Sequence, residues 1–182
     1  FIGALTTAAD INIQASQVYP TTLSTFTITI DPTQNSQSTL HIQGQQPDAV
    51  PLSARGELTM NAGIIDQDGV LKAPFGSISL NAAQQLRFGA NSITSVSGEG
   101  AIIPFGITQG GLNWLYPLDA AAGNLVFNSA SSLLPIQSKQ LNFVSPNIAL
   151  QQGSLINVSG GGDLQAYEFQ TGAGGSNDYL AS

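Results

Sequence analysis

Two aspartates in the stretch Ile65-Asp66-Gln67-Asp68-Gly69 are the carboxylates closest together in the sequence. Residues two apart on an extended strand share a face, which would place these carboxylates about 6.6 Å apart. That separation suits an inverting glycosidase, in which one carboxyl group acts as an acid and the other as a base. The simpler interpretation is a turn, because Asp68-Gly69 is a common turn pair. An EF-hand calcium loop is excluded, since Ser77 stands where such a loop needs a glutamate.

The sequence contains few other residues that could support catalysis or bind a metal. His41 is the only histidine and cysteine is absent, so a zinc site of the usual His and Cys ligands cannot be completed. No Gly-x-Ser-x-Gly sequence supplies a nucleophile elbow, and we interpret His41 as an outward-facing strand residue. Residues 160–163 form a single imperfect copy of a calcium β-roll motif, whereas that motif needs tandem copies. We therefore interpret these residues as a turn at the corner of a coil. The sequence therefore predicts no enzyme, no metal and no cofactor.

The charge of the chain limits the kinds of molecule that it could bind. The chain has 182 residues and a net charge of −7, and charged residues make up only 8% of it. Its four basic residues are scattered, which argues against nucleic acid as a partner. If the chain repeats with the spacing of a β-helical coil, Arg87 would lie beside Gln67 and between Asp66 and Asp68. We therefore expect a surface ion pair at this place.

Three aromatic residues form the remaining candidate site. Phe105, Trp114 and Tyr116 lie in the segment 101–122, which also holds the only tryptophan. Such rings offer a flat apolar face with a polar edge, so they could stack on the rings of a sugar or contact a partner protein. They could equally fill a gap where the segment packs on the rest of the fold. The sequence leaves both interpretations open.

The elements that would position these residues are short strands. Apolar and polar residues alternate along several stretches, which predicts strands with one inward and one outward face: residues 10–15, 26–30, 58–60 and 78–80. Gly, Asn, Asp, Ser and Pro separate these stretches, and no convincing helix is found. We therefore expect an all-β fold.

A repeated phrase indicates how these strands are arranged. Residues 56–62 read GELTMNA and residues 76–82 read GSISLNA, one short interval later. A unit of about 20 residues cannot enclose a core alone, whereas stacked units cover one another. We predict a right-handed parallel β-helix with coils of about 20 residues, and a β-sandwich is the alternative. Asn61 and Asn81 would then form a hydrogen-bonded ladder or face outward at turns.

Two segments break this rhythm. Residues 31–55 are rich in Pro, Gln and Ser, and residues 101–122 hold the tryptophan. We interpret both as excursions from the stack or as coils of different length. With these exceptions, residues 1–182 are expected to form a single β-helix segment, an interior or processed piece of a longer chain.

Several of these stretches resemble a known family. Residues 15–28, 56–82 and 95–106 are similar to the shaft repeats of filamentous-haemagglutinin-type exoproteins. The glycine-rich residues 156–180, INVSGGGDLQAYEFQTGAGGSNDYL, resemble a phrase of very large members of that family. The Asn-rich motifs of the family's secretion domain are not found, which indicates a shaft segment.

The resemblance implies a bacterial adhesin. Such proteins leave the cell by two-partner secretion through an outer-membrane barrel transporter and fold outside as a right-handed β-helix. We therefore expect a secreted or surface-exposed structural and adhesive shaft segment, with a glycan or protein of a host or neighbouring cell as partner. The alternatives are an architectural filament subunit and a β-helical polysaccharide-degrading enzyme. Open strand edges at the ends of such a stack predict end-to-end association of copies.

Overall fold

The computed structural model describes residues 1–31, 33, 36–44, 49–117, 124–126, 139–170, 172–173 and 175–176. Every regular element in these ranges is a β-strand, which confirms the all-β prediction. None of the described residues form a helix that could cross a membrane. The sequence predicted one segment over residues 1–182, whereas the chain divides into two compact units. The first unit comprises residues 1–102 and 137–163, and the second comprises residues 103–136 and 164–182.

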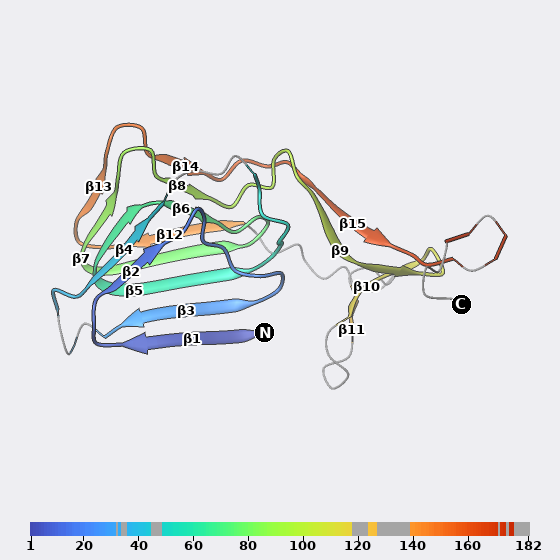
Figure 1. The fold of residues 1–182 in the computed structure, drawn as a ribbon, viewed down its shortest axis with the longest axis horizontal. Helices are drawn as coiled ribbons and strands as arrows, with labels where there is room; N and C mark the ends of the chain where they lie inside the picture. Colours follow the sequence, from blue (N-terminus) through green and yellow to red (C-terminus); the bar gives the residue numbers. More distant parts are fainter. Residues whose placement is uncertain are drawn as a thin grey trace. The chain divides into compact units, whose positions relative to one another are not determined.

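The first unit is built from parallel strands that lie in three columns (Figure 1). The first column contains β1 (Ile2–Thr7), β3 (Thr25–Ile30), the first half of β5 (Glu57–Asp68), the first half of β7 (Ser77–Phe88) and β12 (Gln140–Val144). The second contains β2 (Ile11–Gln14), β4 (Thr39–Gln43), the second halves of β5 and β7, and β13 (Ile148–Leu150). The third contains β6 (Val70–Lys72), β8 (Ile93–Ser95) and β14 (Leu155–Asn157). All of these pairs are parallel, which excludes an antiparallel β-sandwich for this unit.

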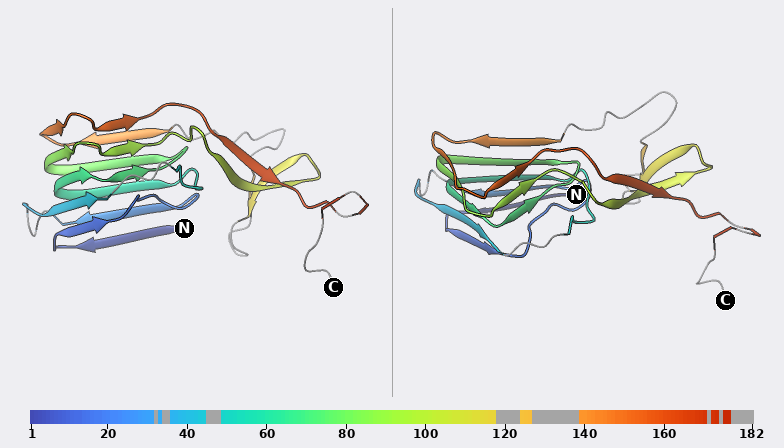
Figure 2. Two further views of the ribbon diagram at one scale, coloured as in Figure 1. Left: turned by 45° about the horizontal axis from the view of Figure 1, so that its top comes forward. Right: turned by 90° about the horizontal axis from the view of Figure 1, so that it is seen from above.

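Strands that follow one another along the chain occupy the same level of different columns, and the levels stack in chain order (Figure 2). In the first column Ile2 pairs with Thr25, Thr25 with Glu57, Glu57 with Ser77 and Ser77 with Gln140. The chain therefore returns to this column at unequal intervals. Of these returns, only the one from Glu57 to Ser77 has the spacing of the repeated phrase.

The second unit is a four-stranded sheet with a different pairing. Its strands are β9 (Ile102–Gln109), β10 (Asn113–Pro117), β11 (Asn124–Val126) and β15 (Asp163–Tyr167), in the order β11-β10-β9-β15. β10 pairs antiparallel with both β9 and β11. The predicted excursion 101–122 thus supplies β9 and β10 of this sheet. Residues 118–122 lie outside the described residues.

Of the two interpretations of residues 31–55, the structure supports a coil of different length, because β4 lies within them and belongs to the second column. Residues 32, 34–35 and 45–48 lie outside the described residues. Leu40 and Ile42 alternate with polar residues along this strand, so both point to the same side, where they are buried in the core. In the third column, by contrast, Val18 pairs directly with Leu71 of β6. Among the described residues, the level that contains β4 therefore supplies no strand to the third column.

The core lies inside the columns and consists of stacks of apolar side chains. In the first column Ile28, Met60 and Leu80 occupy successive levels and are buried. In the second column Leu40, Ile65 and Leu86 do the same. Phe88 and Phe143 meet edge to face across the interior, with ring centroids 4.9 Å apart. Each level is therefore covered by the next, as expected for units that cannot enclose a core alone.

The repeated phrase has a physical reason in this arrangement. Its glycines, Gly56 and Gly76, lie where successive levels approach closely, and the Ser77 amide donates to the Gly56 carbonyl. A Cβ atom placed on Gly76 would lie 1.9 Å from that carbonyl oxygen. Its alanines, Ala62 and Ala82, pair with each other and are buried at the corner between two columns. Close approach and a narrow corner therefore require these small residues.

Gly76→Ala tests this close approach. We expect it to lower the free energy of unfolding by about 1–3 kcal/mol, because the added methyl group collides with backbone atoms of the preceding level. Urea denaturation measures the change. Gly160→Ala is the control, since a Cβ atom there meets nothing within 4 Å, and we expect little effect. Equal losses in the two variants would contradict the explanation.

Candidate functional site

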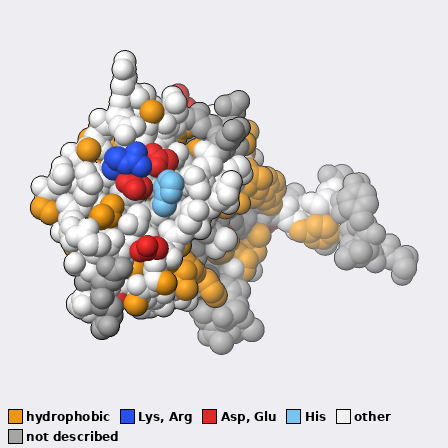
Figure 3. Space-filling view, turned by 60° about the vertical axis from the view of Figure 1, so that its left-hand side comes forward, with side chains coloured by type: hydrophobic (Ala, Val, Ile, Leu, Met, Phe, Trp, Pro, Cys, Tyr) orange, Lys and Arg blue, Asp and Glu red, His pale blue; other side chains and the backbone are white. Residues whose placement is uncertain are grey.

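The second column carries a patch of charged residues on its outer face (Figure 3). His41 of β4, Asp66 of β5 and Arg87 of β7 occupy one register position on three successive strands. Asp68 lies two residues beyond Asp66 on the same face of β5. We call His41, Asp66, Asp68 and Arg87 the charged patch, since ion pairs join them. Figure 3 shows blue, red and pale-blue atoms side by side on one face of the molecule.

Arg87 holds both carboxylates of the charged patch. Its Nε donates to Oδ1 of Asp66 at 2.9 Å, and its two terminal nitrogens donate to Asp68 at 3.0 and 2.6 Å. The hydrogen bonds to Asp68 raise the pKa of Arg87, and against the lowering effect of burial the hydrogen bond to Asp66 and the charges of both carboxylates raise it further. His41 Nε2 lies 3.0 Å from Asp68 Oδ2 on the opposite side. The predicted surface ion pair is thus confirmed.

Both aspartates of the charged patch are engaged by Arg87. Both carboxylates contact the same guanidinium, and their side chains keep only about a quarter of their surface exposed. Asp68 ends β5, and Gly69 forms a bend before β6 begins, which agrees with the predicted turn pair. The charged patch links three strands of one column, a role that requires no reaction.

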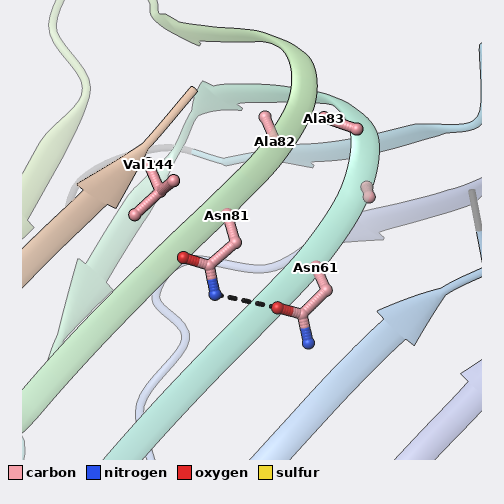
Figure 4. Close-up of a pocket in the computed structure, with 6 residues that line it drawn as sticks. Asn61, Asn81, Ala82, Ala83 and Val144 are labelled. Atoms are coloured by element: carbon pink, nitrogen blue, oxygen red, sulfur yellow. Dashed lines mark hydrogen bonds between the residues drawn. The ribbon is translucent and has the colours of Figure 1, made fainter. Parts of the chain in front are cut away.

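The Asn61–Asn81 pair forms the predicted ladder rather than two isolated turn residues (Figure 4). Asn81 Nδ2 donates to Asn61 Oδ1 at 2.8 Å, and Asn61 Nδ2 donates to the Thr29 hydroxyl at 3.0 Å. The three residues are register partners on β3, β5 and β7. On β12 the same position is occupied by Val144, which is 54% exposed. The ladder therefore ends at the last level.

The three aromatic residues predicted as a contact site come together in the second unit. Phe105 of β9 is buried, and its ring centroid lies 6.2 Å from that of Trp114 and 5.0 Å from that of Tyr116. Trp114 Nε1 donates to the Phe105 carbonyl at 2.6 Å. These contacts support packing, because the polar edge of the indole is already engaged within the unit. Contact with a glycan or a partner protein stays a prediction.

Sequence reasoning missed the role of Glu168. Its carboxylate accepts hydrogen bonds from the amides of Gly110 and Gly111, at 2.8 and 3.1 Å, and from the Thr108 hydroxyl at 3.2 Å. Both glycines have positive φ, 61° and 65°, as a tight turn between β9 and β10 requires. Gly110-Gly111 was a recognisable turn signal, but nothing in the sequence connects it with a carboxylate so far along the chain.

Comparisons with known proteins add no assignment. No protein-family model, curated protein or solved structure matches the chain. Among the described residues, no group of three or more His, Cys, Asp or Glu side chains is arranged to hold a metal ion.

Arg87→Met tests whether the charged patch stabilises the stack. We expect a loss of about 0.5–1 kcal/mol in the free energy of unfolding, because a partly exposed ion pair is screened by water. The loss should shrink in about 1 M NaCl, since salt screens charges. Arg87→Lys keeps the charge but not the paired donors, and should recover only part of the stability. A loss that is unchanged by salt would contradict a stabilisation by screened charges.

Proposed function

We propose that the chain is a structural and adhesive segment of a right-handed parallel β-helix, the shaft of a large secreted bacterial exoprotein. The observation that carries this proposal is the in-register parallel stacking of levels in three columns. Such stacking buries a core along one axis and can be extended without a change of design. A segment of this kind acts as a stiff support.

We infer the right-handed sense of the proposed β-helix from a general rule and from the connections between its strands. Parallel strands joined by a crossover are right-handed in nearly all known proteins. Here, parallel neighbours in the first column are joined by connections that visit the other columns before they return. One coil, which leads from Glu57 to Ser77 in the first column and from Ile65 to Leu86 in the second, has about the predicted length and supports this part of the proposal.

The adhesive part of the proposal assigns contact with other molecules to the aromatic cluster of the second unit. The resemblance to filamentous-haemagglutinin-type proteins supports an extracellular place, reached through an outer-membrane barrel transporter. Low charge and a sequence rich in Gln and Asn are compatible with this role, since amides bind sugars and proteins through hydrogen bonds. Of the three aromatic residues, Tyr116 has a phenol group, which can both donate and accept a hydrogen bond.

A glycan array probed with the labelled chain tests adhesion. We expect binding to a subset of glycans, and a two- to tenfold loss (roughly the worth of one aromatic contact) in Tyr116→Ala. Tyr19→Ala in the first unit is the matched control and should bind as the unchanged chain does. A blank array with a folded chain, verified by circular dichroism, would contradict adhesion and leave a purely architectural filament subunit.

One observation bears on the alternative function, polysaccharide cleavage. The charged patch brings Asp66, Asp68, Arg87 and His41 together on one outer face, as an active site would. We expect it to be inactive, because Arg87 engages both carboxylates. Assays for uronate and reducing-sugar release on several polysaccharides measure this. Release that disappears in Asp66→Asn would overturn the structural assignment and identify an enzyme.

A further inference from the structure

The outer face of the third column carries a groove of about 280 Å³. On this face Ile93 pairs with Leu155 and Ser95 with Asn157, so an apolar row and a polar row lie side by side. Both rows face outward, because Thr94, between two of their residues, points inward and is fully buried. All residues that line the groove belong to the first unit. The groove lies along the side of the stack, so a further level would lengthen it without covering it.

Hydrogen bonds within the first unit fix the walls of this groove. On one side Lys72, the register partner of Ser95, donates to the Ala49 carbonyl at 2.8 Å and so ties that segment to the third column. On the other side the Ser97 amide donates to the Ser95 hydroxyl at 3.2 Å, and the Glu99 amide donates to the Ser97 hydroxyl at 3.1 Å. These turns place the backbone of Glu99 at the rim. The groove is therefore formed before any ligand binds.

Three polar groups of the groove keep hydrogen-bonding capacity that the described part of the chain does not use. The Ser95 side chain is 93% buried, and its hydroxyl accepts from Ser97 but meets no acceptor for its own proton among those residues. Asn157 Oδ1 accepts from the Ser159 amide at 2.8 Å, whereas Nδ2 has no partner there. The Glu99 carboxylate makes one long contact, 3.4 Å, with the Ser159 hydroxyl. A nearly buried hydroxyl proton without an acceptor is costly, so a ligand that accepts it would be stabilised.

These groups define the chemistry of a ligand. It must accept hydrogen bonds from Ser95 and Asn157 and donate one to Glu99. It must also cover Ile93 and Leu155, the latter of which is 49% exposed. A sugar ring meets all of these demands, because each hydroxyl both accepts and donates while the C–H groups of the ring form an apolar face. The volume lies near the lower end of the about 300–1,000 Å³ of small-molecule sites, which fits one ring rather than a larger ligand.

We propose that this groove binds one ring of a neutral hexose, with Ser95 and Asn157 donating to its hydroxyls and Glu99 accepting from one of them. An acidic sugar is disfavoured by the Glu99 carboxylate and by the net charge of −7. An extended peptide is disfavoured because peptides that bind a sheet use a strand edge, and both edges of β8 already pair, with β6 and β14. The inference goes beyond the proposed function, since it places a sugar site in the first unit and does not use the aromatic cluster.

Titration of the isotope-labelled chain with the methyl glycosides of glucose, galactose and mannose, followed by NMR, tests the proposal. We expect saturable shifts of the amide signals of Ser95, Glu99 and Asn157 with at least one sugar. The Kd should be on the order of 1–10 mM, because one ring makes few contacts. Methyl glucuronide and tri-alanine are the acidic and the peptide probe, and neither should produce saturable shifts at these signals.

Two variants connect the binding with the groove. Asn157→Asp removes the amide donors but keeps an oxygen for the Ser159 amide, and should raise the Kd about three- to tenfold, the effect of one hydrogen bond. Glu99→Gln weakens the acceptor without touching the backbone bonds of the turn and should act in the same direction. Asn142→Asp is the matched control, since it makes the same change at an exposed position of β12, and it should bind as the unchanged chain does.

The absence of saturable shifts with all three sugars, in a chain that circular dichroism shows to be folded, would overturn the proposal. An equal loss of binding in Asn142→Asp would overturn it as well, and so would shifts with methyl glucuronide or tri-alanine in place of the neutral sugars. Tyr116→Ala should leave this titration unchanged, because the aromatic cluster belongs to the second unit. A blank glycan array would count against the adhesive function alone, since arrays do not retain millimolar ligands, so the two failures are distinguishable.

Discussion

The parallel alignment of successive levels is the constraint on which the first unit depends. Each level has one layer of inward side chains, and only the neighbouring levels can cover it. A shift of one residue between levels would turn Met60 and Leu80 outward and bring polar neighbours into the core. The same alignment sets the outer surface, since it places Asn81 against Asn61 and Arg87 against Asp66. Core, ladder and charged patch are therefore consequences of one register.

One polar side chain inside the core reinforces that register. Gln67 is fully buried in the second column, between Ile42 and Phe88. Its amide nitrogen donates to the carbonyls of Gly69 and Ile93, at 3.1 and 3.0 Å, and its oxygen accepts from the Gly69 amide. A buried amide is costly unless such partners are met. The bond to Ile93 reaches the next level and would be lost in a slipped alignment, so Gln67 favours the observed one.

The sequence contained enough to predict the inner levels but not the whole chain. The repeated phrase and the alternation in residues 56–62 and 76–82 predict stacking, the Asn ladder and the ion pair at Arg87, because neighbouring levels there differ little. A strand at His41 was predicted, but its place in the stack was hidden among Pro- and Gln-rich neighbours. The strands of the third column are too short to show alternation. The sheet of the second unit has no repeat, and one of its neighbouring pairs, β9 and β15, joins strands far apart in the sequence.

The unequal intervals between levels show where this architecture accepts new material. The chain leaves after β8 and returns at β12, and it still re-enters the first column in register, with Gln140 opposite Ser77. Loop-closure entropy grows only with the logarithm of length, so replacing a single-coil return by this longer one costs about 1 kcal/mol. Whole modules can thus be grafted between two levels while the alignment survives. Proteins of this design can therefore diversify by the insertion of new domains between levels, while the stacked strands are retained.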